Sequence, residues 1–187
     1  MKTKKINLGD LIFILFYKYG GEIKGSTNLQ KLVDIIRLDS DLEVDVNYSP
    51  YDYGDFSQEV YDVLQVYLDN SWLKKEEVEF QEGKKIDIYK LTKNGKKIAQ
   101  TLYNNLLTSE LKSINVVEKF QNKSREEIVA FSYFWYPETA IKSKIKKDIF
   151  KRTPILSNLE GDLEKEYFSI INAGRTIKDV IRESWRC

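Results

Sequence analysis

The sequence predicts a mainly α-helical fold with a small β-hairpin wing, namely a winged helix-turn-helix followed by C-terminal helices. Two runs of strand-forming residues flank Glu82-Gly83-Lys84-Lys85, where glycine permits the positive φ of a hairpin turn. Three short helical patterns precede this hairpin, and amphipathic helical patterns follow it. A hairpin in that position, called a wing, is typical of winged-helix proteins. Such proteins usually bind nucleic acid or protein, although a fold alone does not settle function.

The first part of the chain predicts a helix, a short strand and a second helix. Asn7 is suited to cap a helix over residues 8–19, and Gly20-Gly21 closes it with a left-handed turn. Residues 22–24 form a short strand. Ser26 or Thr27 caps a helix over residues 28–38, whose apolar residues recur at helical spacing.

The segment before the hairpin predicts a strand and a third helix. Apolar residues alternate strictly over residues 42–48, which indicates a strand with one buried face. Ser57 is suited to cap a helix that runs to about Asn70. This helix occupies the position that recognises DNA in many winged helices.

The remainder of the chain predicts further helices. We expect a helix from Thr92 to Leu107, another over residues 111–120, and one that Ser124 and Glu127 open with a capping box. Two amphipathic helices follow at residues 161–173 and 176–185. We therefore expect a winged-helix domain over residues 1–122 and a C-terminal helical extension over residues 123–187, used for packing or for dimerisation.

The composition argues against an enzyme and against a bound cofactor. The chain has no histidine, which removes the commonest general base and the commonest metal ligand. Its only cysteine is Cys187, so an intramolecular disulfide cannot form. No run of about 18 apolar residues is present to span a membrane. We therefore expect a cytoplasmic, non-enzymatic protein with no metal or cofactor.

The middle of the chain is acidic and predicts a surface for a basic partner. Between Leu38 and Leu73 there is no lysine or arginine but there are nine acidic residues. A third helix of this charge repels duplex DNA, because DNA affinity depends on lysine and arginine near the phosphates. A solvated acidic face explains the pattern equally well. The candidate partner-binding residues are Tyr51, Asp52, Tyr53, Asp55, Glu59, Asp62 and Asp69.

Lysine and arginine are concentrated around the wing and in a later segment. A β-hairpin with paired lysines can lie along a phosphate backbone while the acidic helix faces away. Exposed lysines are also common on surfaces that bind nothing. The candidate nucleic-acid-binding residues are Lys84, Lys85, Lys90, Lys93, Lys96, Lys97, Lys142, Lys144, Lys146, Lys147, Lys151 and Arg152.

Four sequence segments carry a resemblance to a known family. They are Leu29-Gln30-Lys31-Leu32-Val33, Pro50-Tyr51-Asp52-Tyr53-Gly54-Asp55-Phe56-Ser57, Tyr89-Lys90-Leu91-Thr92-Lys93-Asn94-Gly95, and Tyr136-Pro137-Glu138 with Ser143. Together they resemble the YwgA-like and SocA-like (Panacea) winged-helix proteins over about residues 8 to 147, and the wing is also similar to that of MarR-like and PadR-like regulators. The resemblance implies a small regulatory or antitoxin-like protein with no active site to transfer.

Two functional hypotheses follow. In the first, the chain is a winged-helix regulator that contacts nucleic acid through the wing and the basic segment at residues 142–152, as a homodimer built on the C-terminal helices. In the second, it is an antitoxin-like interaction module whose acidic surface at residues 39–69 binds a basic protein.

Overall fold

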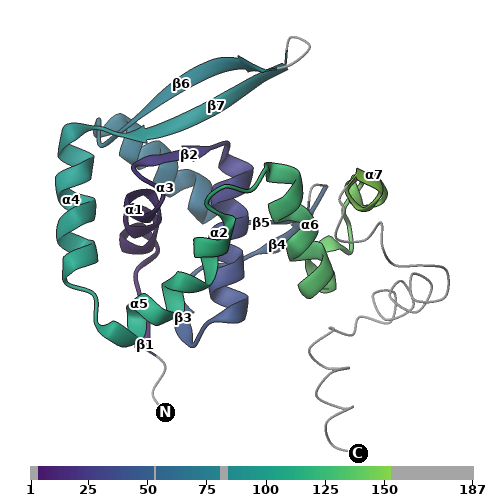
Figure 1. Ribbon diagram of the computed structural model, residues 1–187, viewed down its shortest axis with the longest axis horizontal. Helices are drawn as coiled ribbons and strands as arrows, with labels where there is room; N and C mark the ends of the chain where they lie inside the picture. Colours follow the sequence, from purple (N-terminus) through teal and green to yellow (C-terminus); the bar gives the residue numbers. More distant parts are fainter. Residues whose placement is uncertain (1–3, 53, 81–83, 153–187) are drawn as a thin grey trace, which may run out of the picture. The chain divides into compact units, whose positions relative to one another are not determined.

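The computed structural model describes residues 4–52, 54–80 and 84–152, and shows a mainly helical protein with small sheets (Figure 1). The chain divides into two compact units. Unit 1 comprises Met1–Asn47 and Ser57–Asn122, and unit 2 comprises Tyr48–Phe56 and the residues from Lys123 onward. The segment Tyr48–Phe56, which the predicted 1–122 domain includes, thus clusters with unit 2. The helices expected at 161–173 and 176–185 lie outside the described residues.

Helix α1 (Leu8–Lys18) is the centre of unit 1. Its residues from Leu11 to Phe16 are all buried, and helices α2, α3 and α4 pack against it. The Asn7 side chain accepts a hydrogen bond from Gly9 N at 2.8 Å, and Gly20 and Gly21 have φ values of 70° and 89°. Both ends of α1 are therefore formed by the predicted cap and left-handed turn.

Helix α2 (Ser26–Asp39) departs from the simple amphipathic pattern. The predicted apolar residues are buried, but so are Lys31 at 1% exposure and Asp34 at 0%. The expected cap is wrong, because Gly25 occupies the N-cap position and no side chain caps the helix there. Asp34 accepts two hydrogen bonds from Arg37, at 3.1 and 2.7 Å. Burial raises the pKa of the Asp34 carboxyl, and the charges of Lys31 and Arg37 oppose that rise.

The predicted β-hairpin is present and belongs to a three-stranded sheet, although Lys84 and Lys85, which were expected in the turn, begin its second strand. Strands β6 (Leu73–Phe80) and β7 (Lys84–Leu91) pair antiparallel, and β2 (Glu22–Lys24) pairs with the other side of β7. The strand order is β2-β7-β6. The turn residues 81–83 lie outside the described residues.

A second small sheet of unit 1 is only partly predicted. The expected strand at 42–48 is shorter, β3 (Leu42–Val44), and it pairs in parallel with β1 (Lys4–Ile6). The sequence reasoning missed β1.

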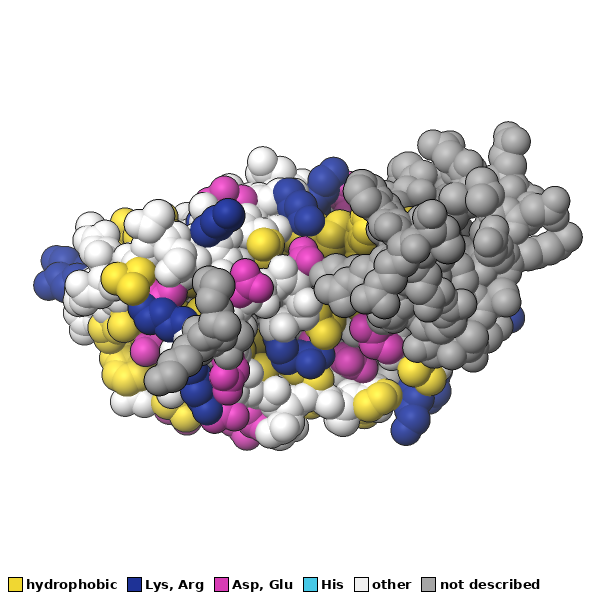
Figure 2. All heavy atoms as spheres, turned by 90° about the horizontal axis from the view of Figure 1, so that it is seen from below, with side chains coloured by type: hydrophobic (Ala, Val, Ile, Leu, Met, Phe, Trp, Pro, Cys, Tyr) yellow, Lys and Arg dark blue, Asp and Glu magenta, His cyan; other side chains and the backbone are white. Residues whose placement is uncertain are grey.

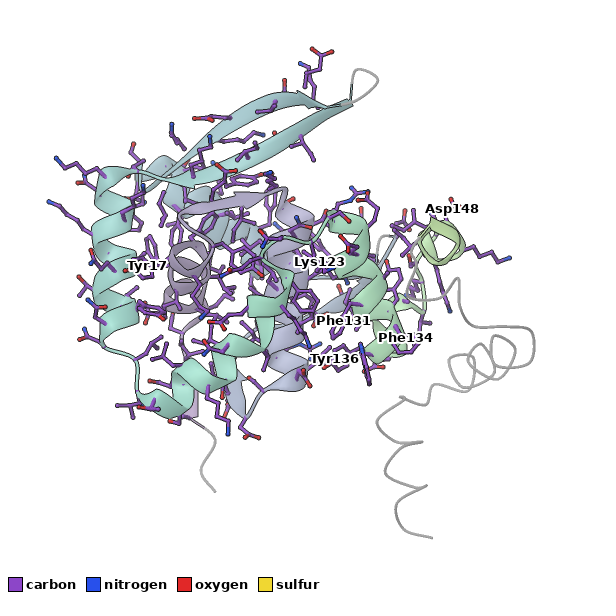
Figure 3. The ribbon with its side chains drawn as sticks, in the orientation of Figure 1. Tyr17, Lys123, Phe131, Phe134, Tyr136 and Asp148 are labelled. Atoms are coloured by element: carbon purple, nitrogen blue, oxygen red, sulfur yellow. The ribbon has the colours of Figure 1, made fainter. Side chains whose placement is uncertain are left out.

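Helices α3 and α4 lie on either side of the hairpin in the chain. Helix α3 (Gln58–Asp69) begins after Ser57, whose side chain accepts from Val60 N, as predicted. Helix α4 (Lys93–Asn104) is shorter than expected, and Thr92 is its N-cap. It packs on α1, where the centroids of the Tyr17 and Tyr103 rings are 4.8 Å apart; Tyr17 is labelled in Figure 3. Unit 1 then ends with α5 (Thr108–Ile114) and the 3₁₀ helix η2 (Asn115–Phe120), which together replace the expected helix at 111–120.

Unit 2 joins a strand pair to a group of short helices. Strands β4 (Ser49–Tyr51) and β5 (Gly54–Phe56) pair antiparallel, and β5 packs against the 3₁₀ helix η3 (Pro137–Ala140). Helix α6 (Arg125–Trp135) opens with the predicted capping box of Ser124 and Glu127. It carries Phe131 and Phe134, and helix α7 (Lys146–Arg152) completes the described part (Figure 3). Tyr133 is fully buried there with Ala130, Ala140 and Ile149.

Candidate functional site

The inner face of α3 fixes which of its residues point outward. Val60, Leu64 and Tyr67 are buried, at the spacing of one helical face. The Tyr67 ring stacks on Phe13 of α1 with 4.1 Å between centroids, and its hydroxyl donates to Gly9 O at 2.6 Å. Burial raises the pKa of Tyr67, so its hydroxyl stays protonated as a donor. Because these contacts hold α3 in one rotation, its opposite face is turned away from the core.

The opposite face of α3, which we call the α3 outer face, combines carboxylates with exposed apolar side chains. Tyr61 is 45% exposed and Val66 is 50% exposed. Both side chains are large and mainly apolar, although polar residues at these two positions would not weaken the core. The α3 outer face consists of Gln58, Tyr61, Asp62, Gln65, Val66 and Asp69.

The carboxylates of α3 are held by neutral side chains. Gln58 donates to Asp62 Oδ1 and Gln65 donates to Asp69 Oδ1, each at 2.8 Å. Asn47 donates to Glu59 Oε1, also at 2.8 Å. Within the described part of the chain, no salt bridge joins an α3 carboxylate to a lysine or arginine. The helix therefore retains three uncompensated negative charges.

The lysines of the hairpin β6–β7, in contrast, are largely paired with carboxylates of the same sheet. Lys85 pairs with Glu77 at 2.6 Å, and Lys90 pairs with Glu76 at 2.6 Å and with Glu22 at 3.4 Å. Hydrogen bonds from Lys74 and Lys90 lower the pKa of Glu76 to about 2. The side chain of Lys84, which is also a predicted nucleic-acid contact, lies outside the described residues. The hairpin therefore presents much less free positive charge than its lysine content suggests.

A separate group of lysines stands at the start of α4. Lys93, Lys96 and Lys97 are exposed, and no salt bridge engages them among the described residues. The sequence contains no acidic residue from Ile88 to Ser109. Since a helix N-terminus carries partial positive charge, these lysines add to a field that already attracts anions. We call Lys93, Lys96 and Lys97 the α4 lysine cluster.

In unit 2, a predicted nucleic-acid contact, Lys144, is paired with a predicted partner contact, Asp52. Lys144 donates to Asp52 Oδ2 at 2.7 Å, and its backbone N–H donates to Asp52 O at 2.8 Å. Tyr51 is 55% exposed next to this pair, while Asp55 is half-buried. Lys142 and Lys147 are exposed, and burial lowers the pKa of Lys146. Tyr53 and the side chains of Lys151 and Arg152 lie outside the described residues.

Charges on the visible face of the molecule are mixed. Figure 2 shows lysine and arginine side chains interspersed with acidic ones, with no single large region of either sign on that face.

The described residues contain no group of three or more histidine, cysteine, aspartate or glutamate side chains placed to hold a metal ion. None of the described helices combines the length and the apolarity needed to cross a membrane.

The sequence reasoning missed four residues of the α3 outer face, namely Gln58, Tyr61, Gln65 and Val66. Tyr61 and Val66 fall on the helical face of Asp62 and Asp69, opposite the apolar stripe of Val60, Leu64 and Tyr67. Helical spacing alone could have placed them there.

We find no matching family model, and no similar protein among the curated proteins or the solved structures.

Proposed function

We propose that this chain is a non-enzymatic, antitoxin-like protein-interaction module of winged-helix type, which binds a partner through the α3 outer face. The order α1, β2, α2, α3, β6, β7, α4 and the strand order β2-β7-β6 support the winged-helix assignment. The assignment of function rests on the surface, because the fold does not determine it.

The observation that carries the proposal is the chemistry of the α3 outer face. Tyr61 and Val66 are exposed beside Asp62 and Asp69, and the helix has no lysine or arginine. Tyrosine supplies a large contact area with little entropy loss, and the carboxylates select a positively charged partner. The same charges repel the phosphates that a DNA-recognition helix must approach. The surface therefore fits a protein segment rich in lysine or arginine, whose aliphatic stems can cover the exposed apolar groups.

Affinity purification of the tagged full-length chain from its own cells tests this proposal. We expect a stoichiometric protein partner that is lost when Asp62→Lys and Asp69→Lys are combined. The matched control combines Glu79→Lys and Asp148→Lys, which makes the same change of charge at exposed acids outside residues 39–69. Retention of the partner by the α3 double variant, with folding verified by circular dichroism, would contradict the proposal.

A second candidate function is contact with nucleic-acid phosphates, and the α4 lysine cluster favours it. In this candidate function, the hairpin β6–β7 and the basic segment at residues 142–152 share the contact with the phosphates. Fluorescence anisotropy with generic duplex DNA at two salt concentrations tests this candidate. Binding at low salt that weakens steeply with added salt, and is lost on Lys93→Glu with Lys97→Glu, would support it. If that variant binds duplex DNA as the natural chain does, other residues make the contact with the phosphates.

A further inference from the structure

Two helices of unit 1 carry opposite charge at equal length. Helices α3 and α4 each have 12 residues, so each is about 18 Å long. Helix α3 contains Glu59, Asp62 and Asp69 and no base, whereas α4 contains the three residues of the α4 lysine cluster and no acid. The two helices are therefore complementary in charge.

The residues of the α4 lysine cluster do not stabilise α4 itself. Cations near a helix N-terminus oppose the helix dipole and lower its stability by a few tenths of a kcal/mol each. Lys93 is the first residue of α4, and no acidic residue lies in the first turn. A Cβ built on Gly21 would lie 3.2 Å from Lys96 Cε, so the aliphatic part of Lys96 lies over that glycine. We therefore infer that these charges attract an anionic group outside unit 1.

We propose that the α3 outer face of one copy binds the α4 lysine cluster of a second copy. This inference rests on the proposed function, because it names the partner of the same α3 surface. In a closed dimer with two-fold symmetry the contact is reciprocal, so each acidic helix meets a basic one and both clusters are neutralised. The lysine stems cover Val66 with methylene groups, and an ammonium group over the Tyr61 ring adds a cation–π contact.

A charge swap measured by sedimentation velocity tests this dimer with the full-length chain. We expect the natural sequence to sediment as a dimer at low salt and to dissociate as salt screens the contact. Two double variants each carry like charge on both helices: Asp62→Lys with Asp69→Lys, and Lys93→Glu with Lys97→Glu. Each is expected to be monomeric alone. An equimolar mixture is expected to form a one-to-one heterodimer, because each variant then supplies the complement of the other.

The outcomes separate this inference from the proposed function. A natural chain that is monomeric at every concentration and salt, double variants that dimerise as the natural chain does, or a mixture that stays monomeric would overturn self-association through α3 and α4. If self-association fails while affinity purification still yields a partner lost in the α3 double variant, the proposed function stands with another protein as partner. If that partner is retained, the proposed function fails as well.

Discussion

At the scale of single residues, buried hydroxyl groups set a pH limit on stability. Tyr133 is fully buried in unit 2 and lies 2.9 Å from the Ser143 hydroxyl. Burial is the main reason that its pKa rises to about 12, compared with about 10 for an unfolded tyrosine. The unfolded chain therefore loses this proton first. As a result, Tyr133 stabilises the fold fully below about pH 10, and its contribution falls as the pH rises toward 12.

The Tyr133→Phe substitution tests this linkage. At neutral pH we expect the variant to unfold with a free energy about 1 kcal/mol lower, because the hydrogen bond to Ser143 is lost. Above about pH 10 the difference should shrink, since phenylalanine has no proton to release. Urea unfolding followed by circular dichroism at both pH values measures it. A difference that stays constant with pH would contradict the linkage.

Gly95 fixes the junction between the hairpin and α4. A Cβ at this position would lie 2.1 Å from the Trp72 carbonyl oxygen, a backbone atom that cannot rotate away. We therefore expect Gly95→Ala to lower the free energy of unfolding by more than about 2 kcal/mol. The neighbouring Asn94→Ala, at an exposed position, should change it by less than about 0.5 kcal/mol. Equal effects of the two substitutions would show that the close approach to Trp72 is not what limits this site.

At the scale of elements, local signals in the sequence were sufficient for caps and for the hairpin. Asn7, Ser57 and Ser124 cap the helices that the sequence assigned to them, because a cap needs only a side chain and the next few backbone N–H groups. The hairpin β6–β7 likewise joins residues close in the chain. These features are encoded within a few residues.

Elements that depend on distant pairing were not predictable in the same way. Strand β1 has three residues and becomes a strand only by pairing with β3. The pair β4–β5 includes Pro50, which argues against a strand when judged locally, although proline is tolerated at sheet edges. Similarly, the burial of Lys31 and Asp34 comes from tertiary packing that the helical pattern of α2 does not reveal. The acidic charge of the candidate site was evident from sequence, whereas the pairing of the wing lysines required the hairpin register.

The contact between Asp52 and Lys144 determines how firmly β4–β5 is held within unit 2. The Lys144 side chain bonds the Asp52 carboxylate, and the backbone N–H bonds the Asp52 carbonyl. For Lys144→Ala we expect faster amide exchange in residues 49–56, with a loss of at most about 1 kcal/mol in global stability because the pair is exposed. Hydrogen–deuterium exchange by mass spectrometry measures this. Lys147→Ala is the control and should leave exchange in that segment unchanged, and an identical effect of both would contradict the role of the ion pair.

At the scale of the whole molecule, a near-neutral net charge conceals the separation of negative and positive charges onto different helices. The chain has a formal net charge of +1, yet α3 carries only acids and α4 only bases among their charged residues. Where the wing mixes lysine and glutamate, the charges cancel within the sheet. If the proposed function holds, long-range attraction of the partner depends on α3 and α4, and we expect it to weaken as ionic strength rises.

The central claim is that the α3 outer face contacts protein, and site-specific photo-crosslinking tests it most directly. A photo-reactive amino acid at position 66, where Val66 is half exposed, places the probe on this face, and one at the exposed Lys112 of α5, outside both α3 and α4, provides a control. In the protein's own cells we predict a discrete crosslinked protein from position 66 that disappears when Asp62→Lys and Asp69→Lys are added, with none of that product from position 112. Absence of any crosslinked protein at position 66, or a product that persists in the charge-reversed chain, would contradict the claim.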